Sequence, residues 1–173
     1  MAASIQIIVV GFDYSPAGFR ALENGIRMAS RVRSAEPHVL LVAREAGDEV
    51  RIDALGLVLS PVSAALMLRE DVEAETRKAA IRGEARGLSR VVTHVRAGDP
   101  ADELVLLAAS LGAGAIVLGE ARKTLPPAGV RGRVTERVRR AARCPVYAGT
   151  NVSGEVPMAG AFHDWERTRR IVA

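Results

Sequence analysis

The strongest constraint on the fold is a set of five short apolar segments, which are separated by stretches with helical periodicity. Most of these segments are continuous rather than alternating, as is typical of parallel strands covered on both faces. Strands of this kind that alternate with helices predict a three-layer α/β/α fold, Rossmann-like, around a five-stranded parallel sheet. The predicted strands are residues 5–12, 38–43, 90–97, 115–120 and 145–149.

Capping signals support the helices between those strands. Ser15 with Pro16 predicts the start of the first helix, and Asp99 with Pro100 predicts the start of the third. Ser and Asp side chains accept hydrogen bonds from free helical N–H groups, and Pro fits the first turn. Right-handed crossovers place ligand sites at the carboxyl ends of the strands, where the strand order reverses. The segment GFDYS and the loop that begins at Gly119 follow two predicted strands.

Two segments do not fit this alternation. Residues 47–60 combine GDEVRID with an apolar run. This segment is compatible with three roles: a lid, a contact with a partner, or an extension of the second helix. Residues 151–173 form a polar tail, in which Phe162 and Trp165 predict a short docking helix, the alternative being a frayed end. We therefore expect one domain over residues 1–150 and a C-terminal tail.

Composition limits the class of protein. The chain has 173 residues, of which 49% are hydrophobic and 25% charged. This length is enough for one domain with a buried core, and the composition is typical of globular proteins. No apolar run reaches the roughly 20 residues of a membrane helix, and the first ten residues favour a strand over a signal peptide. The single cysteine, Cys144, excludes an internal disulfide and fits a reducing compartment. We expect a cytoplasmic protein without a membrane partner.

Positive charge is concentrated in one part of the chain. The net charge is +4, and residues 119–143 alone contain eight basic residues against Glu120 and Glu136, a local +6. The arginines of the predicted fourth helix do not share one side, because a helix turns about 100° per residue. Aromatic residues make up 3% of the chain, so base stacking is not supported. A solvated face is favoured over a nucleic-acid partner.

One loop has the position of a phosphate site. Residues 119–135, GEARKTLPPAGVRGRVT, lie between the fourth predicted strand and an amphipathic stretch that predicts the fourth helix. A glycine-bearing segment in that position offers backbone N–H groups to a phosphate. Pro126 and Pro127 stiffen the loop and withhold two donors.

Four segments, in the same order along the chain, resemble the universal stress protein family. They are VVGFDYSPAGFRAL, VRAGDPADELVLLAA, AIVLGEARK and AARCPVYAG. The resemblance covers about residues 5–149, nearly the whole chain apart from residues 47–60 and the tail. It implies a sheet with strand order 3-2-1-4-5, a role in stress tolerance and assembly as a homodimer.

In the nucleotide-binding branch of that family, adenine nucleotides are held by the pattern Gly-x2-Gly-x9-Gly-(Ser/Thr). Gly119 matches the first glycine and Gly132 the third, with the spacing retained. Arg122 stands where the second glycine belongs, and Arg133 where the Ser or Thr belongs. Thr135 lies two positions beyond the expected hydroxyl.

Two further positions carry over from the same branch. Asp13 matches the acidic residue that contacts the nucleoside, and Val42 matches the residue that lines the adenine. From the residues alone, Asp13 has a second interpretation, because an Asp after a strand often caps the next helix. The predicted nucleotide-binding residues are Gly11, Phe12, Asp13, Val42, Leu118, Gly119, Arg122, Gly132, Arg133, Val134 and Thr135.

The two arginines leave three interpretations open. A Cβ at position 122 makes a left-handed conformation cost roughly 1–2 kcal/mol, which favours a degraded loop in a stress-response or regulatory module that acts through dimerisation and a protein partner. Alternatively, Arg122 and Arg133 grip phosphate, and the protein binds ATP or AMP, with Mg²⁺ in the case of ATP. In the third interpretation, these arginines and Lys123 hold a different anion or nucleotide.

Catalysis and metal binding have no visible signature. The sequence contains no Gly-x-Ser-x-Gly elbow, paired metal-ligating histidines or complete Walker pattern. We expect at most weak ATP hydrolysis and no metal site.

The last predicted strand, which begins at Pro145 and ends at Gly149, is a candidate dimer interface. If it lies at the edge of the sheet, it exposes unpaired backbone groups that a twofold mate could satisfy. We therefore expect a homodimer through this strand.

Overall fold

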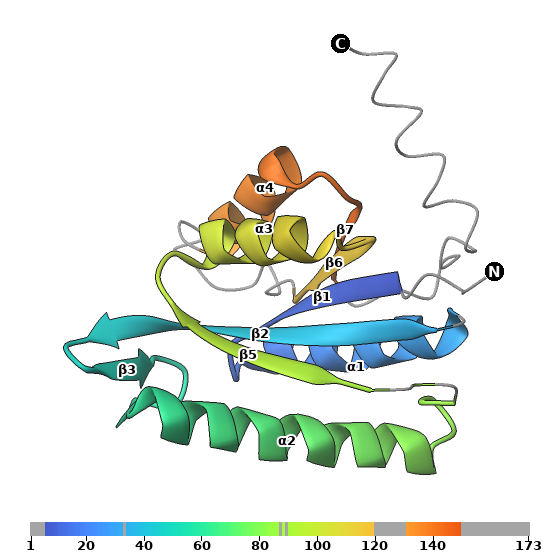
Figure 1. Cartoon of the computed structure of the whole chain (residues 1–173), viewed down its shortest axis with the longest axis horizontal. Helices are drawn as coiled ribbons and strands as arrows, with labels where there is room; N and C mark the ends of the chain where they lie inside the picture. The colour runs from blue at the N-terminus through green and yellow to red at the C-terminus, as the bar shows by residue number, and fades with distance from the viewer. Residues whose placement is uncertain (1–5, 33, 87, 89, 120–130, 150–173) are drawn as a thin grey trace.

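The computed structural model describes residues 6–32, 34–86, 88, 90–119 and 131–149 (Figure 1). The predictions for Arg122 and for residues 151–173 lie outside the described residues. The elements are β1 (Gln6–Phe12), α1 (Pro16–Arg31), β2 (Ala35–Ala46), β3 (Glu49–Ile52), β4 (Leu57–Leu59), α2 (Pro61–Ile81), β5 (Val92–Ala97), α3 (Pro100–Leu111), β6 (Ala115–Leu118), α4 (Arg131–Ala141) and β7 (Val146–Ala148).

Five parallel strands form the centre of the sheet, in the order β5-β2-β1-β6-β7. The α/β fold is therefore the predicted one, and β1 is the strand from which the chain crosses first to one side and then to the other. The predicted strand count is wrong. An antiparallel hairpin, β3–β4, extends the sheet beyond β2 and makes it a mixed sheet of seven strands.

The hairpin corrects the interpretation of residues 47–60 as a helix extension. Val50 and Ile52 are buried while the residues between and beside them are exposed, and this two-residue period belongs to a strand rather than to a helix. Gly56, with φ of 65°, closes the turn between the two strands, a conformation that glycine adopts without steric cost. The alternating burial of β3 and the glycine turn are therefore those of a β-hairpin.

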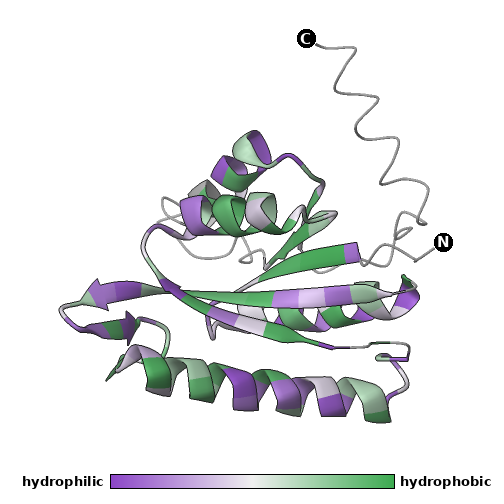
Figure 2. Ribbon diagram, viewed as in Figure 1, coloured by the Kyte–Doolittle hydropathy of each residue, from purple (hydrophilic) through white to green (hydrophobic). Residues whose placement is uncertain are grey.

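Two helices cover each face of the sheet (Figure 1). On one side, α1 and α2 bury a core that includes Leu22, Ile26 and Leu68 against β1 and β2. On the other side, α3 and α4 bury a second core that includes Leu107 and Val138. β1 and the middle of β2 lie between these layers and are green in Figure 2, which explains the continuous apolar segments of the sequence, whereas the ends of β2 and part of β5 are purple.

The helix starts were predicted correctly. The Ser15 side chain caps α1 and accepts a hydrogen bond from the Gly18 N–H at 3.1 Å. The Asp99 carboxylate caps α3 and accepts from the N–H groups of Ala101 and Asp102. The capped N-termini of α1 and α3 lie at the edge of the sheet at which β1 and β5 end.

Candidate functional site

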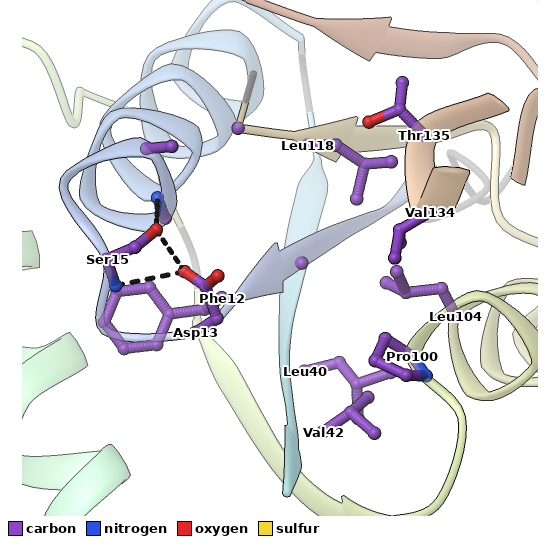
Figure 3. A pocket seen from close by; sticks show the side chains of 14 residues that line it. Phe12, Asp13, Ser15, Leu40, Val42, Pro100, Leu104, Leu118, Val134 and Thr135 are labelled. Carbon is purple, nitrogen blue, oxygen red and sulfur yellow. Dashed lines mark hydrogen bonds between the residues drawn. The ribbon is translucent and has the colours of Figure 1, made fainter. Parts of the chain in front are cut away.

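A pocket of about 160 Å³ lies where the carboxyl ends of β1 and β6 and the middle of β2 meet the N-terminal turns of α1, α3 and α4 (Figure 3). This is the edge at which open parallel sheets bind ligands, beside the strand where the order reverses. The lining residues are Gly11, Phe12, Asp13, Ser15, Ala17, Gly18, Leu40, Val42, Pro100, Leu104, Leu118, Gly119, Val134 and Thr135.

The structure brings together most of the predicted nucleotide-binding residues. Eight of them line this one pocket, although their sequence positions span more than 120 residues: Gly11, Phe12, Asp13, Val42, Leu118, Gly119, Val134 and Thr135. Gly132 and Arg133 belong to the first turn of α4, directly before two lining residues. Arg122 lies outside the described residues.

Six lining residues were not among the predicted ones. Ser15 was predicted as a helix cap, and Leu40 lies two residues before Val42 on the same strand, so a period-two argument could have found it. Pro100 and Leu104 come from α3, and Ala17 and Gly18 from α1. The approach of these helices to the pocket depends on packing, which the sequence pattern does not specify.

Asp13 is the ionisable side chain among the fourteen described lining residues. It is exposed, and its Oδ1 accepts a hydrogen bond from the Ser15 N–H at 3.0 Å and another from the Ser15 hydroxyl. Within the described residues, no hydrogen bond reaches its Oδ2. The carboxylate therefore both orders the turn before α1 and keeps one acceptor oxygen available at the pocket.

The first glycine of the family pattern has a packing role. A Cβ built on Gly119 would lie 2.1 Å from the carbonyl oxygen of Ala17 and 2.9 Å from the Ala17 Cβ. These atoms belong to a helical turn that cannot swing aside. Gly119 thus lets the end of β6 pass directly over the first turn of α1, which brings two walls of the pocket into contact.

Tyr14, between Asp13 and Ser15, has a left-handed backbone with φ of 60°. Its hydroxyl donates a hydrogen bond to Asp71 Oδ2 on α2 at 2.8 Å. Its ring packs edge-on against Phe12, with centroids 4.7 Å apart, and lies 6.3 Å from that of Phe19. Burial, followed by the hydrogen bond and the charge of Asp71, raises the pKa of the Tyr14 hydroxyl, so this hydroxyl stays a proton donor.

An ion-pair cluster joins α3 and α4, the two helices that contribute Pro100, Leu104, Val134 and Thr135 to the pocket wall. Arg137 of α4 donates to Asp99 Oδ2 and to Asp102 Oδ1 of α3, both at 2.8 Å. The hydrogen bond from Arg137 is the main cause that holds the pKa of Asp99 below its usual range. All three side chains are exposed to solvent, where such pairs contribute little to stability, so the cluster mainly fixes the register of α4 on α3.

Other titratable groups lie outside this pocket. His38 Nδ1 and His94 Nε2 are 2.8 Å apart, and His38 Nε2 lies 2.9 Å from Glu36 Oε1. Burial raises the pKa of the Cys144 thiol to about 11. Among the described residues, no group of three or more His, Cys, Asp or Glu side chains could hold a metal ion.

The described part of the chain has no helix that is both long enough and apolar enough to span a membrane.

Solved structures share this fold. A universal stress protein from Archaeoglobus fulgidus is 23% identical, with a TM-score of 0.57 over 84% of this chain and 98% of its own. A universal stress protein in complex with cAMP is 22% identical, with a TM-score of 0.54 over 86% of this chain and 100% of its own. The Archaeoglobus fulgidus universal stress protein in complex with dAMP is 21% identical, with a TM-score of 0.53 over 84% of this chain and 97% of its own.

The sequence itself matches a family model. No curated protein matches it. The model of the universal stress protein family, however, aligns with residues 4–148 of the 173 residues. Because this match spans most of the chain and the solved structures share its fold, the chain belongs to the universal stress protein family.

Proposed function

We propose that the protein is a regulatory module of the stress response that binds an adenine nucleoside or nucleotide in the pocket at the carboxyl ends of β1 and β6, beside the middle of β2. The observation that carries this proposal is an apolar cavity with one carboxylate at its mouth. Ligand pockets commonly combine apolar walls with a few polar groups that fix orientation.

The walls suit the face of a purine. Leu40 and Val42 come from β2, Leu118 from β6, and Leu104 from α3 (Figure 3). The volume of about 160 Å³ is smaller than the roughly 300–1,000 Å³ of pockets that enclose drug-sized ligands. It would therefore enclose the base and leave the sugar and phosphate at the mouth.

Charged and polar groups at the pocket indicate where the sugar and the phosphate of the ligand would lie. The Asp13 carboxylate is a hydrogen-bond acceptor and repels phosphate, so it suits the hydroxyls of a ribose. The first turn of α4, beside Val134 and Thr135, presents free N–H groups that suit an anion. We therefore place the phosphate of a bound nucleotide at α4, with Arg133 in that same turn.

Two related structures support the class of ligand. The proteins in them hold cAMP and dAMP, which share an adenine base and a single phosphate. We extend that ligand class, adenine nucleotides including AMP and ATP, to this chain as a proposal. No catalytic step is proposed.

Calorimetry with AMP, and with ATP in the presence and absence of Mg²⁺, tests this proposal, with GMP as the control ligand. We expect Val42→Trp to fill the pocket and weaken binding more than about tenfold, the equivalent of 1.4 kcal/mol. Val92→Trp, on the neighbouring strand and outside the pocket, should bind as the wild type does. No heat of binding at millimolar nucleotide would contradict the proposal.

The same titration distinguishes the interpretations of the two arginines. If Arg122 and Arg133 hold phosphate, changing them to Ala weakens AMP binding and leaves adenosine binding unchanged. If they block the loop, Arg122→Gly with Arg133→Ser strengthens AMP binding. Either result assigns the arginines, and an unchanged affinity in both variants would exclude them from the site.

A second candidate role, the binding of a protein partner, is favoured by the hairpin. Leu55, Leu57 and Val58 of the hairpin and Val62 and Leu66 of α2 are exposed, and residues 54–67 contain no charged side chain. Apolar surface of this kind is typical of interaction sites. We propose that this hairpin patch engages a protein partner.

Stress survival of a deletion strain that expresses variants tests the hairpin patch. Leu57→Lys with Val58→Lys should abolish rescue while leaving nucleotide affinity unchanged. The matched control is Ile81→Lys, because Ile81 is an exposed apolar residue at the opposite end of α2. Full rescue by the double variant would contradict a role for the hairpin.

A further inference from the structure

The turn that carries Asp13 into the pocket is backbone-strained. Tyr14 and Ser34 are the non-glycine residues with positive φ in the described part of the chain, and Tyr14 lies between two pocket residues. A left-handed conformation costs free energy for a bulky side chain, and such strain persists where surrounding contacts determine it.

The contacts that hold Tyr14 reach across the molecule. Its hydroxyl bonds Asp71 on α2, 57 residues away in the sequence. Its ring lies in a trio with Phe12 and Phe19. The hydrogen bond to a carboxylate is of the stronger, charge-assisted kind, so it is the contact best able to offset the backbone strain.

The strained turn determines where the Asp13 carboxylate lies. In this turn, Oδ1 receives the N–H and the hydroxyl of Ser15. It also occupies the space that a side chain at position 18 would need, since a Cβ on Gly18 would lie 2.5 Å from Oδ1. The second oxygen, Oδ2, remains without a partner among the described residues at the mouth of the pocket.

We propose that Tyr14 is a positioning residue of the pocket: through its hydrogen bond to Asp71, it holds the left-handed turn that presents the Asp13 carboxylate to the sugar of a bound nucleoside. This inference rests on the proposed function for its ligand. The positioning itself is a property of the ligand-free protein, so the two are tested separately.

Amide hydrogen exchange of the ligand-free protein tests the positioning. Tyr14→Phe keeps the ring and the strain but removes the hydroxyl, and Asp71→Ala removes the acceptor. Each should accelerate exchange at the Ser15 amide about tenfold, and the double variant should be no faster than either. Tyr147→Phe, at the other tyrosine of the chain, should change nothing. Unchanged Ser15 exchange in Tyr14→Phe would overturn the proposal.

Glycine at position 14 separates backbone strain from packing. Because glycine adopts positive φ without a steric cost, Tyr14→Gly should restore slow exchange at Ser15 relative to Tyr14→Phe, although it loses the aromatic contacts. If Tyr14 acted by packing alone, Tyr14→Gly would be the faster-exchanging variant of the two. That result would also overturn the proposal, and Tyr14→Phe still decides if Tyr14→Gly does not fold.

Ligand affinity supplies the second readout. Tyr14→Phe should weaken adenosine binding about tenfold and leave binding of 2′,3′-dideoxyadenosine unchanged, because the latter lacks the hydroxyls that Asp13 would accept. Equal loss for both ligands would contradict action through Asp13. If the wild type bound neither, the proposed function would fail, while the exchange at Ser15 would still decide the role of Tyr14.

Discussion

At the scale of single residues, a position can satisfy a family pattern for a reason other than ligand contact. Gly119 matches the first glycine of a nucleotide loop, yet the nearest atoms to a Cβ there belong to the backbone of Ala17. Its contribution to the pocket is the close approach of β6 to α1. Asp13 has two roles at once, because its carboxylate accepts a hydrogen bond in the turn before α1 and also lines the pocket.

We therefore expect Gly119→Ala to destabilise the fold by about 1–3 kcal/mol, the usual range for overpacking. Urea unfolding measures this change. Gly112→Ala is the control: Gly112 has φ of 61° with no atom within 4 Å of the added Cβ, so it loses only the backbone term of roughly 1–2 kcal/mol. A Gly119→Ala protein as stable as the wild type would show that β6 and α1 are not in contact as described.

At the scale of elements, the residue period determined which parts of the fold could be predicted. Continuous apolar runs and capped amphipathic stretches specified the parallel strands and the helix starts, because both signals are local. The hairpin was not predicted, because β4 has three residues and β3 four, too few for a period to stand out. In the site, Asp13 followed from topology and Val42 from the family resemblance, whereas Pro100 and Leu104 depend on how α3 packs.

Strands β2 and β5 are joined by a histidine pair that predicts pH dependence. Burial, followed by the charges of His38 and Arg96, lowers the pKa of His94, while Glu36 and Arg90 lie on the other side of His38. A lowered folded-state pKa means that the unfolded chain binds the proton more tightly. The contribution of His94 to the free energy of unfolding is therefore complete above the ordinary His pKa of about 6.5. It decreases as the pH drops below that value.

The measurement is urea unfolding at pH 7.5 and pH 5.5. The wild type should have a lower free energy of unfolding at pH 5.5, and His94→Gln should lose part of that difference. The same pH dependence in both proteins would assign the acid sensitivity to other groups.

At the scale of the whole molecule, the sheet ends in two different edges. On one side lie β5 and the apolar hairpin, which both pair with β2, and on the other lies β7, which pairs with β6 alone in the described sheet. The Ile116 N–H bonds the Pro145 carbonyl, so in this parallel pairing Val146 and Ala148 turn their backbone groups outward. We propose that a second copy pairs with β7 along residues 145–149.

Sedimentation equilibrium tests that pairing. The wild type should have twice the mass of the 18.4 kDa chain, and Ala148→Pro, which removes an outward N–H, should shift it toward the monomer. Thermal unfolding must show that the variant stays folded. A wild-type monomer, or a dimer that Ala148→Pro leaves intact, would contradict pairing through β7.

The central claim is that the ends of β1 and β6, together with the middle of β2, form an adenine-nucleotide pocket. Its most direct test is a titration of the isotope-labelled protein with AMP, followed by amide chemical shifts. We expect saturable shifts at Gly11, Val42, Leu118 and Val134, with no change at the hairpin tip near Leu55. Shifts absent from these four amides at saturating AMP, or confined to another face, would contradict the claim.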